Sequence, residues 1–150
     1  MSATSEAQII QCAACGSKNR VPAEKLREGL EPVCGRCKRP LLSIQPEIIT
    51  DANFLEKVER SMLPVLLDMW APWCGPCRMV GPIVEQLAGE LAGRVKVAKL
   101  NTDENPLTQA RFNVRSIPTL LVLKEGREVD RLVGAMPKRE ILRRLESIIR

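Results

Sequence analysis

Six cysteines and no histidine define the chemistry that this chain of 150 residues can carry. The absence of histidine excludes Ser-His-Asp and Cys-His catalysis and every metal site that uses imidazole. Proton transfer near neutral pH must therefore use a carboxylate, a thiol or a lysine with a shifted pKa. The cysteines form three Cys-x-x-Cys pairs with none left over: Cys12/Cys15, Cys34/Cys37 and Cys74/Cys77.

The first two pairs have the spacing of a four-cysteine zinc site, with residues 16–33 between them. Residues 1–46 contain no aromatic residue. A segment of this kind seldom folds without a metal, disulfides or a partner domain. We therefore expect Cys12, Cys15, Cys34 and Cys37 to hold one zinc ion in a closed structural site. Two extra redox disulfides are one alternative, and a zinc site that releases its metal on oxidation is another.

The third pair lies where a buried strand should give way to a helix. The run Val65–Trp70 is apolar except for Asp68, which is typical of a strand buried on both faces. A helix predicted from about Cys74 to Leu91 puts Cys74 at its N-terminus, where free N–H groups favour a thiolate. A lowered pKa makes Cys74 a better nucleophile, and Cys77 is one turn away. An inert buried pair or a structural disulfide is the alternative.

The remaining segments alternate between strand and helix patterns. A helix beginning near Thr50 or Asp51 should carry apolar residues on one face: Phe54, Leu55, Val58 and Met62. Further strands are predicted at 48–49, 95–100, 119–123 and 129–133, and further helices at 106–112 and from 137. This order predicts an α/β fold, a mixed sheet with helices on both sides. The composition changes near residues 43–47, so we expect two domains, 1–46 and 47–150.

Several motifs in the second domain resemble those of the thioredoxin family. They are Trp73-Cys74-Gly75-Pro76-Cys77, Ser116-Ile117-Pro118-Thr119 and Val133-Gly134-Ala135. The resemblance implies the thioredoxin fold, a central mixed β-sheet flanked by helices, preceded here by a small zinc-ribbon-like domain. The four N-terminal cysteines are similar to those of the zinc-binding second type of bacterial thioredoxin.

The resemblance implies a protein-disulfide reductase. Cys74 would attack a target disulfide, Cys77 would resolve the mixed disulfide, and thioredoxin reductase would restore the dithiol with electrons from NADPH. Pro118 would be a cis-proline, although only about 5–6% of X–Pro bonds in folded proteins are cis. The implied substrate-binding residues surround the dithiol: Trp73, Gly75, Pro76, Ile117, Pro118, Gly134 and Ala135.

Asp68 stands inside an apolar strand, where a carboxylate is costly unless it is paired or protonated. Burial should raise its pKa towards neutrality. The family's buried aspartate matches this position, which implies that Asp68 accepts the proton of Cys77. Lys99, in the neighbouring predicted strand, is expected to modulate the pKa of Asp68. A purely structural ion pair between Lys99 and Asp68 is the alternative.

Charge and hydropathy limit the partners. The net charge of +5 permits contact with acidic partners but does not demand nucleic acid, and residues 1–46 offer no aromatic for base stacking. No apolar run reaches membrane-span length and no signal-peptide pattern is visible. We expect a cytoplasmic monomer whose partners are disulfide-containing proteins. The alternative from another class is a zinc-ribbon binding module that recruits a redox-sensing domain.

Overall fold

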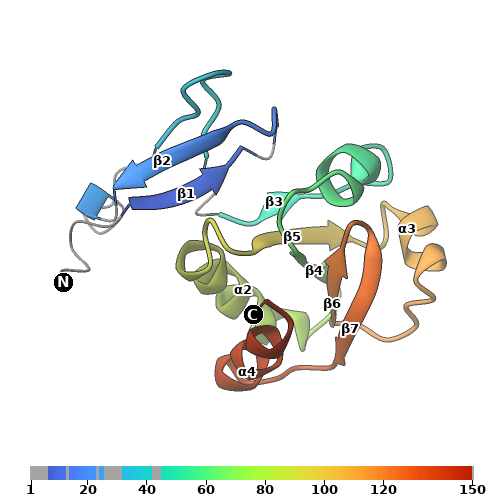
Figure 1. Ribbon diagram of the computed structural model, residues 1–150. Coiled ribbons are helices and arrows are strands. Elements are labelled where there is room, and N and C mark those ends of the chain that lie inside the picture. Colours follow the sequence, from blue (N-terminus) through green and yellow to red (C-terminus); the bar gives the residue numbers. More distant parts are fainter. Residues whose placement is uncertain (1–6, 13, 23, 26–31, 42–44, 150) are drawn as a thin grey trace.

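The computed structural model describes residues 7–12, 14–22, 24–25, 32–41 and 45–149. These residues form a two-stranded sheet and a five-stranded sheet (Figure 1). The expected domain boundary near residues 43–47 lies partly outside the described residues. Within the described ranges, no helix has the length and apolar character needed to cross a membrane.

The five-stranded sheet is mixed, as the order of strand and helix patterns predicts. Its strands are β3 (Glu47–Ile48), β4 (Val65–Trp70), β5 (Lys96–Asn101), β6 (Thr119–Lys124) and β7 (Arg127–Val133). The spatial order is β3-β5-β4-β6-β7, with β3, β5 and β4 parallel and with β6 antiparallel to both β4 and β7. The apolar run therefore becomes the central strand β4, and its carboxyl end leads to the Cys-Gly-Pro-Cys segment.

Helices cover both faces of this sheet. One face packs against α2 (Cys77–Glu90) and α4 (Lys138–Ile149), through a core that includes Leu66 and Val84. The other face packs against a π-helical segment, η2 (Leu55–Glu59), and against residues that follow α3 (Pro106–Arg111). Figure 1 shows α2 and α4 together on one side of the sheet and α3 on the other. Because side chains alternate along a strand, Leu66 and Asp68 of β4 face α2, whereas Leu67 and Met69 face η2.

The region before β4 differs from the predicted helix. Phe54 and Val58 are buried as expected, but Leu55 and Met62 are about half exposed. The helical part ends at Glu59 and its hydrogen bonds follow the wider π pattern, so the four apolar residues do not share one face.

The N-terminal region is built around a hairpin of β1 (Ala7–Gln11) and β2 (Lys18–Pro22). A bridge between Val33 and Pro40 closes a second loop. Each loop carries one Cys-x-x-Cys pair. The apolar core of this region is small and consists of three aliphatic residues packed with cysteines: Ile10, Val21 and Leu41 with Cys12, Cys34 and Cys37.

Candidate active site and metal site

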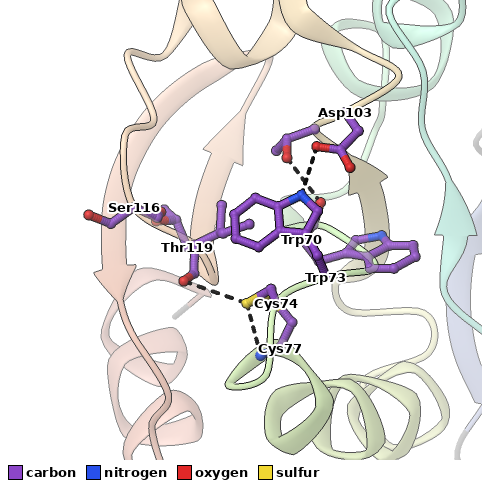
Figure 2. The surroundings of a disulfide bond; sticks show 9 residues. Trp70, Trp73, Cys74, Cys77, Asp103, Ser116 and Thr119 are labelled. Carbon is purple, nitrogen blue, oxygen red and sulfur yellow. Dashed lines mark hydrogen bonds between the residues drawn. A yellow bond between two sulfur atoms is a disulfide. The ribbon is translucent and has the colours of Figure 1, made fainter.

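The dithiol lies at the start of α2, where Cys74 and Cys77 form a disulfide (Figure 2). The helix begins at Cys77 rather than Cys74, because residues 75–76 form a turn first. Cys74 still receives the expected helix-terminal donor, since the backbone N–H of Cys77 donates to the Cys74 sulfur at 3.2 Å. Such a donor stabilises a thiolate once the disulfide is reduced. Gly75 and Pro76 between the cysteines are exposed, whereas both cysteines are buried.

The segment Ser116–Thr119 faces the disulfide (Figure 2). The Cys74 sulfur lies 3.7 Å from the carbonyl oxygen of Ile117. The Ile117–Pro118 peptide bond is cis. The backbone N–H of Gly134 donates to the carbonyl of Pro118 at 2.8 Å, which joins the end of β7 to this segment. The structure thus brings together Cys74, Ile117, Pro118 and Gly134, which are far apart in the sequence.

Trp73 forms an exposed apolar rim beside the disulfide. Its side chain is 69% exposed, and its indole N–H donates to Asp103 Oδ1 at 3.1 Å (Figure 2). An indole held on the surface by a single polar bond leaves most of its ring free for contact. Ala135, on the β7 side of the site, is also exposed.

Asp68 is almost completely buried, at 1% exposure, and its Oδ1 has no hydrogen-bond partner among the described residues. Burial raises the pKa of Asp68 to about 6, and the positive charge of Lys99 partly opposes that rise. The two residues are register partners in β4 and β5. No Asp68–Lys99 ion pair occurs in the part of the chain that the structure describes; the ammonium of Lys99 lies over the Trp70 ring, 4.9 Å from its centroid.

A cavity of about 600 Å³ opens beside the dithiol. Its walls include Cys77 from α2, Lys99 from β5 and Trp70 at the end of β4. Two charged side chains of α2, Arg78 and Glu85, also line it. Solvent can therefore approach Cys77 from the side of the sheet on which Asp68 lies.

The four N-terminal cysteines meet in one cluster. Their sulfurs all lie within 4.8 Å of one another, and Cys12–Cys37 and Cys15–Cys34 are each separated by 3.6 Å. All four are free thiols. A tetrahedral zinc ion with Zn–S bonds of about 2.3 Å sets its sulfurs about 3.8 Å apart. The cluster therefore fits a zinc ion held by four thiolates.

Two loops with the same backbone pattern present these sulfurs. In the first, the N–H of Gly16 donates to the carbonyl of Cys12 at 2.8 Å, and in the second the N–H of Lys38 donates to the carbonyl of Cys34 at 2.9 Å. Gly16 and Lys38 have φ values of +77° and +67°. In each loop, the residue directly after the Cys-x-x-Cys pair therefore has the left-handed conformation, which favours glycine and which Lys38 adopts in the second loop.

The surroundings of Cys34 favour its charged form. The backbone N–H of Cys37 is the main cause that lowers the pKa of Cys34 to about 6, against burial, which raises it. The N–H of Arg36 and the amide of Asn19 lower it further. A thiolate at neutral pH is the form that binds metal.

Comparison with known proteins assigns the two regions to families. The Thioredoxin family model matches residues 45–147. The chain belongs to the thioredoxin family. A zinc-ribbon model described as "Thioredoxin 2, N-terminal" matches residues 11–39, which include all four clustered cysteines.

Curated relatives support the same assignment. The chain is 46% identical to Thioredoxin C-3 of Corynebacterium nephridii over 139 residues, 93% of this chain and 94% of that protein. It is 52% identical to a thioredoxin of Synechocystis sp. over 72% of this chain and 100% of that protein. It is 54% identical to a Haemophilus influenzae thioredoxin, over 62% of this chain and 87% of that protein. The protein is therefore a thiol-disulfide oxidoreductase with Cys74 and Cys77 as its redox-active pair.

One surface residue of this thioredoxin's site was missed in the sequence. Asp103 accepts the indole N–H of Trp73. Asp103 follows the carboxyl end of β5, which lies beside the carboxyl end of β4 in the parallel part of the sheet. Ligands bind at that edge of α/β sheets, so the strand order would have indicated Asp103.

Proposed function

We propose that this thioredoxin is a protein-disulfide reductase that thioredoxin reductase recycles with electrons from NADPH. The observation that carries the proposal is the placement of Cys74. Its sulfur accepts the N–H of Cys77 at the helix start, faces the Ile117 carbonyl and lies beside the exposed indole of Trp73. A nucleophilic thiol beside an exposed apolar surface is suited to exchange with another protein's disulfide.

The proposed reaction begins with the Cys74 thiolate, which attacks one sulfur of a target disulfide. A Cys74–target disulfide forms, and the other target sulfur leaves as a thiolate. The Cys77 thiolate then attacks the Cys74 sulfur and releases the second target thiol. The Cys74–Cys77 disulfide remains, and thioredoxin reductase returns two electrons to it.

Asp68 is proposed as the group that accepts the proton of Cys77 in the second step. A pKa of about 6 leaves Asp68 ionised but basic enough to take a proton near neutral pH. Its strand position turns it towards α2, the helix that begins at Cys77. Lys99 modulates this base through its charge rather than through a direct ion pair.

The proposed substrate surface surrounds Cys74. An extended target segment would lie against Trp73, the Gly75-Pro76 turn, and the two segments joined by the Gly134–Pro118 hydrogen bond. The members of this surface are Trp73, Gly75, Pro76, Ile117, Pro118, Gly134 and Ala135. Their apolar character indicates recognition by shape and backbone bonds rather than by charge.

The proposal extends to the rest of the chain. Cys12, Cys15, Cys34 and Cys37 would hold one zinc ion that stabilises a separate domain, residues 1–46, beside a thioredoxin domain, residues 47–150. The cluster geometry supports this assignment. We propose a cytoplasmic monomer that binds neither nucleic acid nor membranes.

A trapping experiment tests the order of the two cysteines. Cys77→Ser should accumulate a Cys74–target disulfide with a disulfide-containing protein such as insulin, because the resolving thiol is missing. Intact mass spectrometry under non-reducing conditions would detect the adduct. Cys74→Ser is the matched control and should trap no more than a trace. Equal trapping by both variants, or trapping only by Cys74→Ser, would contradict the assigned roles.

A further inference from the structure

The amide of Asn19 lies between the two cysteine loops and uses all of its polar atoms there. Its Nδ2 donates to the carbonyl of Ser17 at 3.1 Å and to the Cys34 sulfur at 3.5 Å. Its Oδ1 accepts the backbone N–H of Gly35 at 2.9 Å. An asparagine amide offers two donor hydrogens and one acceptor oxygen. Both polar atoms of the Asn19 amide therefore have partners in the two loops.

The bonds of Asn19 connect the loops to each other. Ser17 belongs to the first loop, where its carbonyl also accepts the N–H of Cys12 at 2.8 Å. Gly35 and Cys34 belong to the second loop. The Asn19 side chain thus links the first loop, through the Ser17 carbonyl, to the second loop, through the N–H of Gly35 and the sulfur of Cys34. The four sulfurs can take a tetrahedral arrangement only if the two loops keep a fixed separation.

Cys34 is the sulfur that depends most on such donors. It is completely buried, and it accepts the N–H groups of Arg36 at 3.4 Å and Cys37 at 3.5 Å in addition to Asn19. The backbone donors belong to the loop that carries Cys34 itself. Among the described residues, Asn19 is the one non-cysteine side chain with a hydrogen bond to a sulfur of the cluster.

We propose that Asn19 is a positioning residue of the zinc site, one that fixes the Cys34 sulfur and holds the two loops at the spacing that the metal requires. The inference rests on the proposed zinc binding. Four thiolates around a divalent ion carry a net charge of −2, and N–H donors to sulfur offset part of it. Partners of metal ligands orient them, and their loss typically weakens metal binding about 10- to 100-fold.

The decisive variant is Asn19→Asp, which has nearly the same shape. An oxygen can still accept the N–H of Gly35, but the donor to the Cys34 sulfur is lost. The matched control is Gln11→Glu, because Gln11 Nε2 donates to the carbonyl of Gly16 at 3.0 Å in the first loop and has no bond to sulfur. Both changes convert one amide into one acid near the same cluster.

The measurement is zinc affinity of the full chain, by competition with a chromophoric chelator. Asn19→Asp should bind zinc about tenfold more weakly than the wild type, or weaker still. Gln11→Glu should lose clearly less zinc affinity than Asn19→Asp. Asn19→Ala, which adds no charge, should show the same loss as Asn19→Asp. Cobalt(II) substitution provides a spectroscopic check, since the thiolate-to-cobalt band should shift in the Asn19 variants and stay in place in Gln11→Glu.

Two results would overturn the inference while leaving zinc binding intact. One is an equal loss of affinity in Asn19→Asp and Gln11→Glu. The other is wild-type affinity in Asn19→Ala, which would assign the effect of Asn19→Asp to its added charge. A wild-type chain that binds no zinc would instead overturn the proposed zinc site itself, so the two failures are distinguishable.

Discussion

The burial of a single residue, Asp68, changes the acidity of its carboxyl group. It lies in the central strand with 1% exposure and an unpartnered Oδ1 within the described ranges. Its pKa is raised by burial to about 6, above the value of 3.8 for a free aspartate. The folded protein therefore favours the neutral acid, and ionisation near neutral pH lowers the free energy of unfolding.

This pKa shift predicts that Asp68→Asn stabilises the protein at pH 8. The carboxyl of the unfolded chain ionises near pH 4, whereas that of the folded chain ionises near pH 6. The free energy of unfolding should therefore fall as the pH rises through this window, by about 3 kcal/mol at about 1.4 kcal/mol per pKa unit. The asparagine amide cannot ionise, so the free energy of unfolding of the variant should not fall over this pH range.

Urea unfolding of both oxidised proteins at pH 4 and pH 8 would measure the difference. We expect the advantage of Asp68→Asn to be large at pH 8 and much smaller at pH 4. An advantage independent of pH would contradict the raised pKa of Asp68.

The sequence predicts single residues well where the local pattern determines their surroundings. A carboxyl group inside an apolar strand pattern indicates burial from the sequence alone. The partner of Lys99 was harder to predict, because a long flexible side chain can reach either the carboxyl or the face of Trp70. The hydrogen bond from Trp73 to Asp103 joins residues 30 positions apart in the sequence. It can be predicted only when the order of the strands in the sheet is known.

The turn between β6 and β7 contacts two other elements of the fold. Glu125 and Gly126 both have positive φ values, +53° and +80°, as a two-residue hairpin turn of this kind requires. A Cβ at Gly126 would lie 2.6 Å from Cγ of Glu59 in η2. Nη2 of Arg111 donates to both the Gly126 carbonyl and Glu59 Oε1. The turn therefore packs closely against two other elements.

Gly126→Ala should lower the free energy of unfolding by about 1–3 kcal/mol, because it adds backbone strain and a steric conflict with Glu59. Gly81→Ala is a suitable control. Gly81 lies inside α2 with open space around its Cα, so alanine should be neutral or stabilising there. Thermal unfolding of both variants would measure the effect, and equal stability of the two would contradict the role of the turn.

Elements with a strong pattern were predicted closely. The strand Val65–Trp70 has the predicted limits, and the hairpin and the last helix differ by one or two residues. The region 50–62 was wrong in detail, because apolar spacing alone does not distinguish an α-helix from one wide π turn. Phe54 and Val58 lie four residues apart and pack inward, while Leu55 and Met62 are turned away from the core.

At the scale of the whole molecule, the two sheets depend on different sources of stability. The five-stranded sheet has a large apolar core on each face. The hairpin of β1 and β2 rests on a core in which the cysteines themselves take part. Below about 40 residues, a core of that size rarely holds a fold without a metal or disulfides.

Removal of the proposed zinc ion should therefore unfold only the N-terminal region. In Cys12→Ser, or after treatment with a strong chelator, backbone amides of β1 and β2 should exchange with deuterium much faster. The amides of β4, β5 and β6 should keep wild-type protection, since their core contains no metal ligand. Hydrogen-exchange mass spectrometry would measure both regions. Loss of protection throughout the chain would contradict the division into two domains.

We propose that Cys74 and Cys77 reduce protein disulfides while the other four cysteines hold a metal ion. The most direct test of this proposal is NADPH-coupled reduction of insulin with thioredoxin reductase, with wild type, Cys74→Ser and Cys12→Ser compared at equal concentration. We predict rapid NADPH oxidation with the wild type, near-complete loss in Cys74→Ser, and most of the rate retained in Cys12→Ser. Full activity in Cys74→Ser, or a loss of activity in Cys12→Ser equal to that in Cys74→Ser, would contradict this division of roles among the six cysteines.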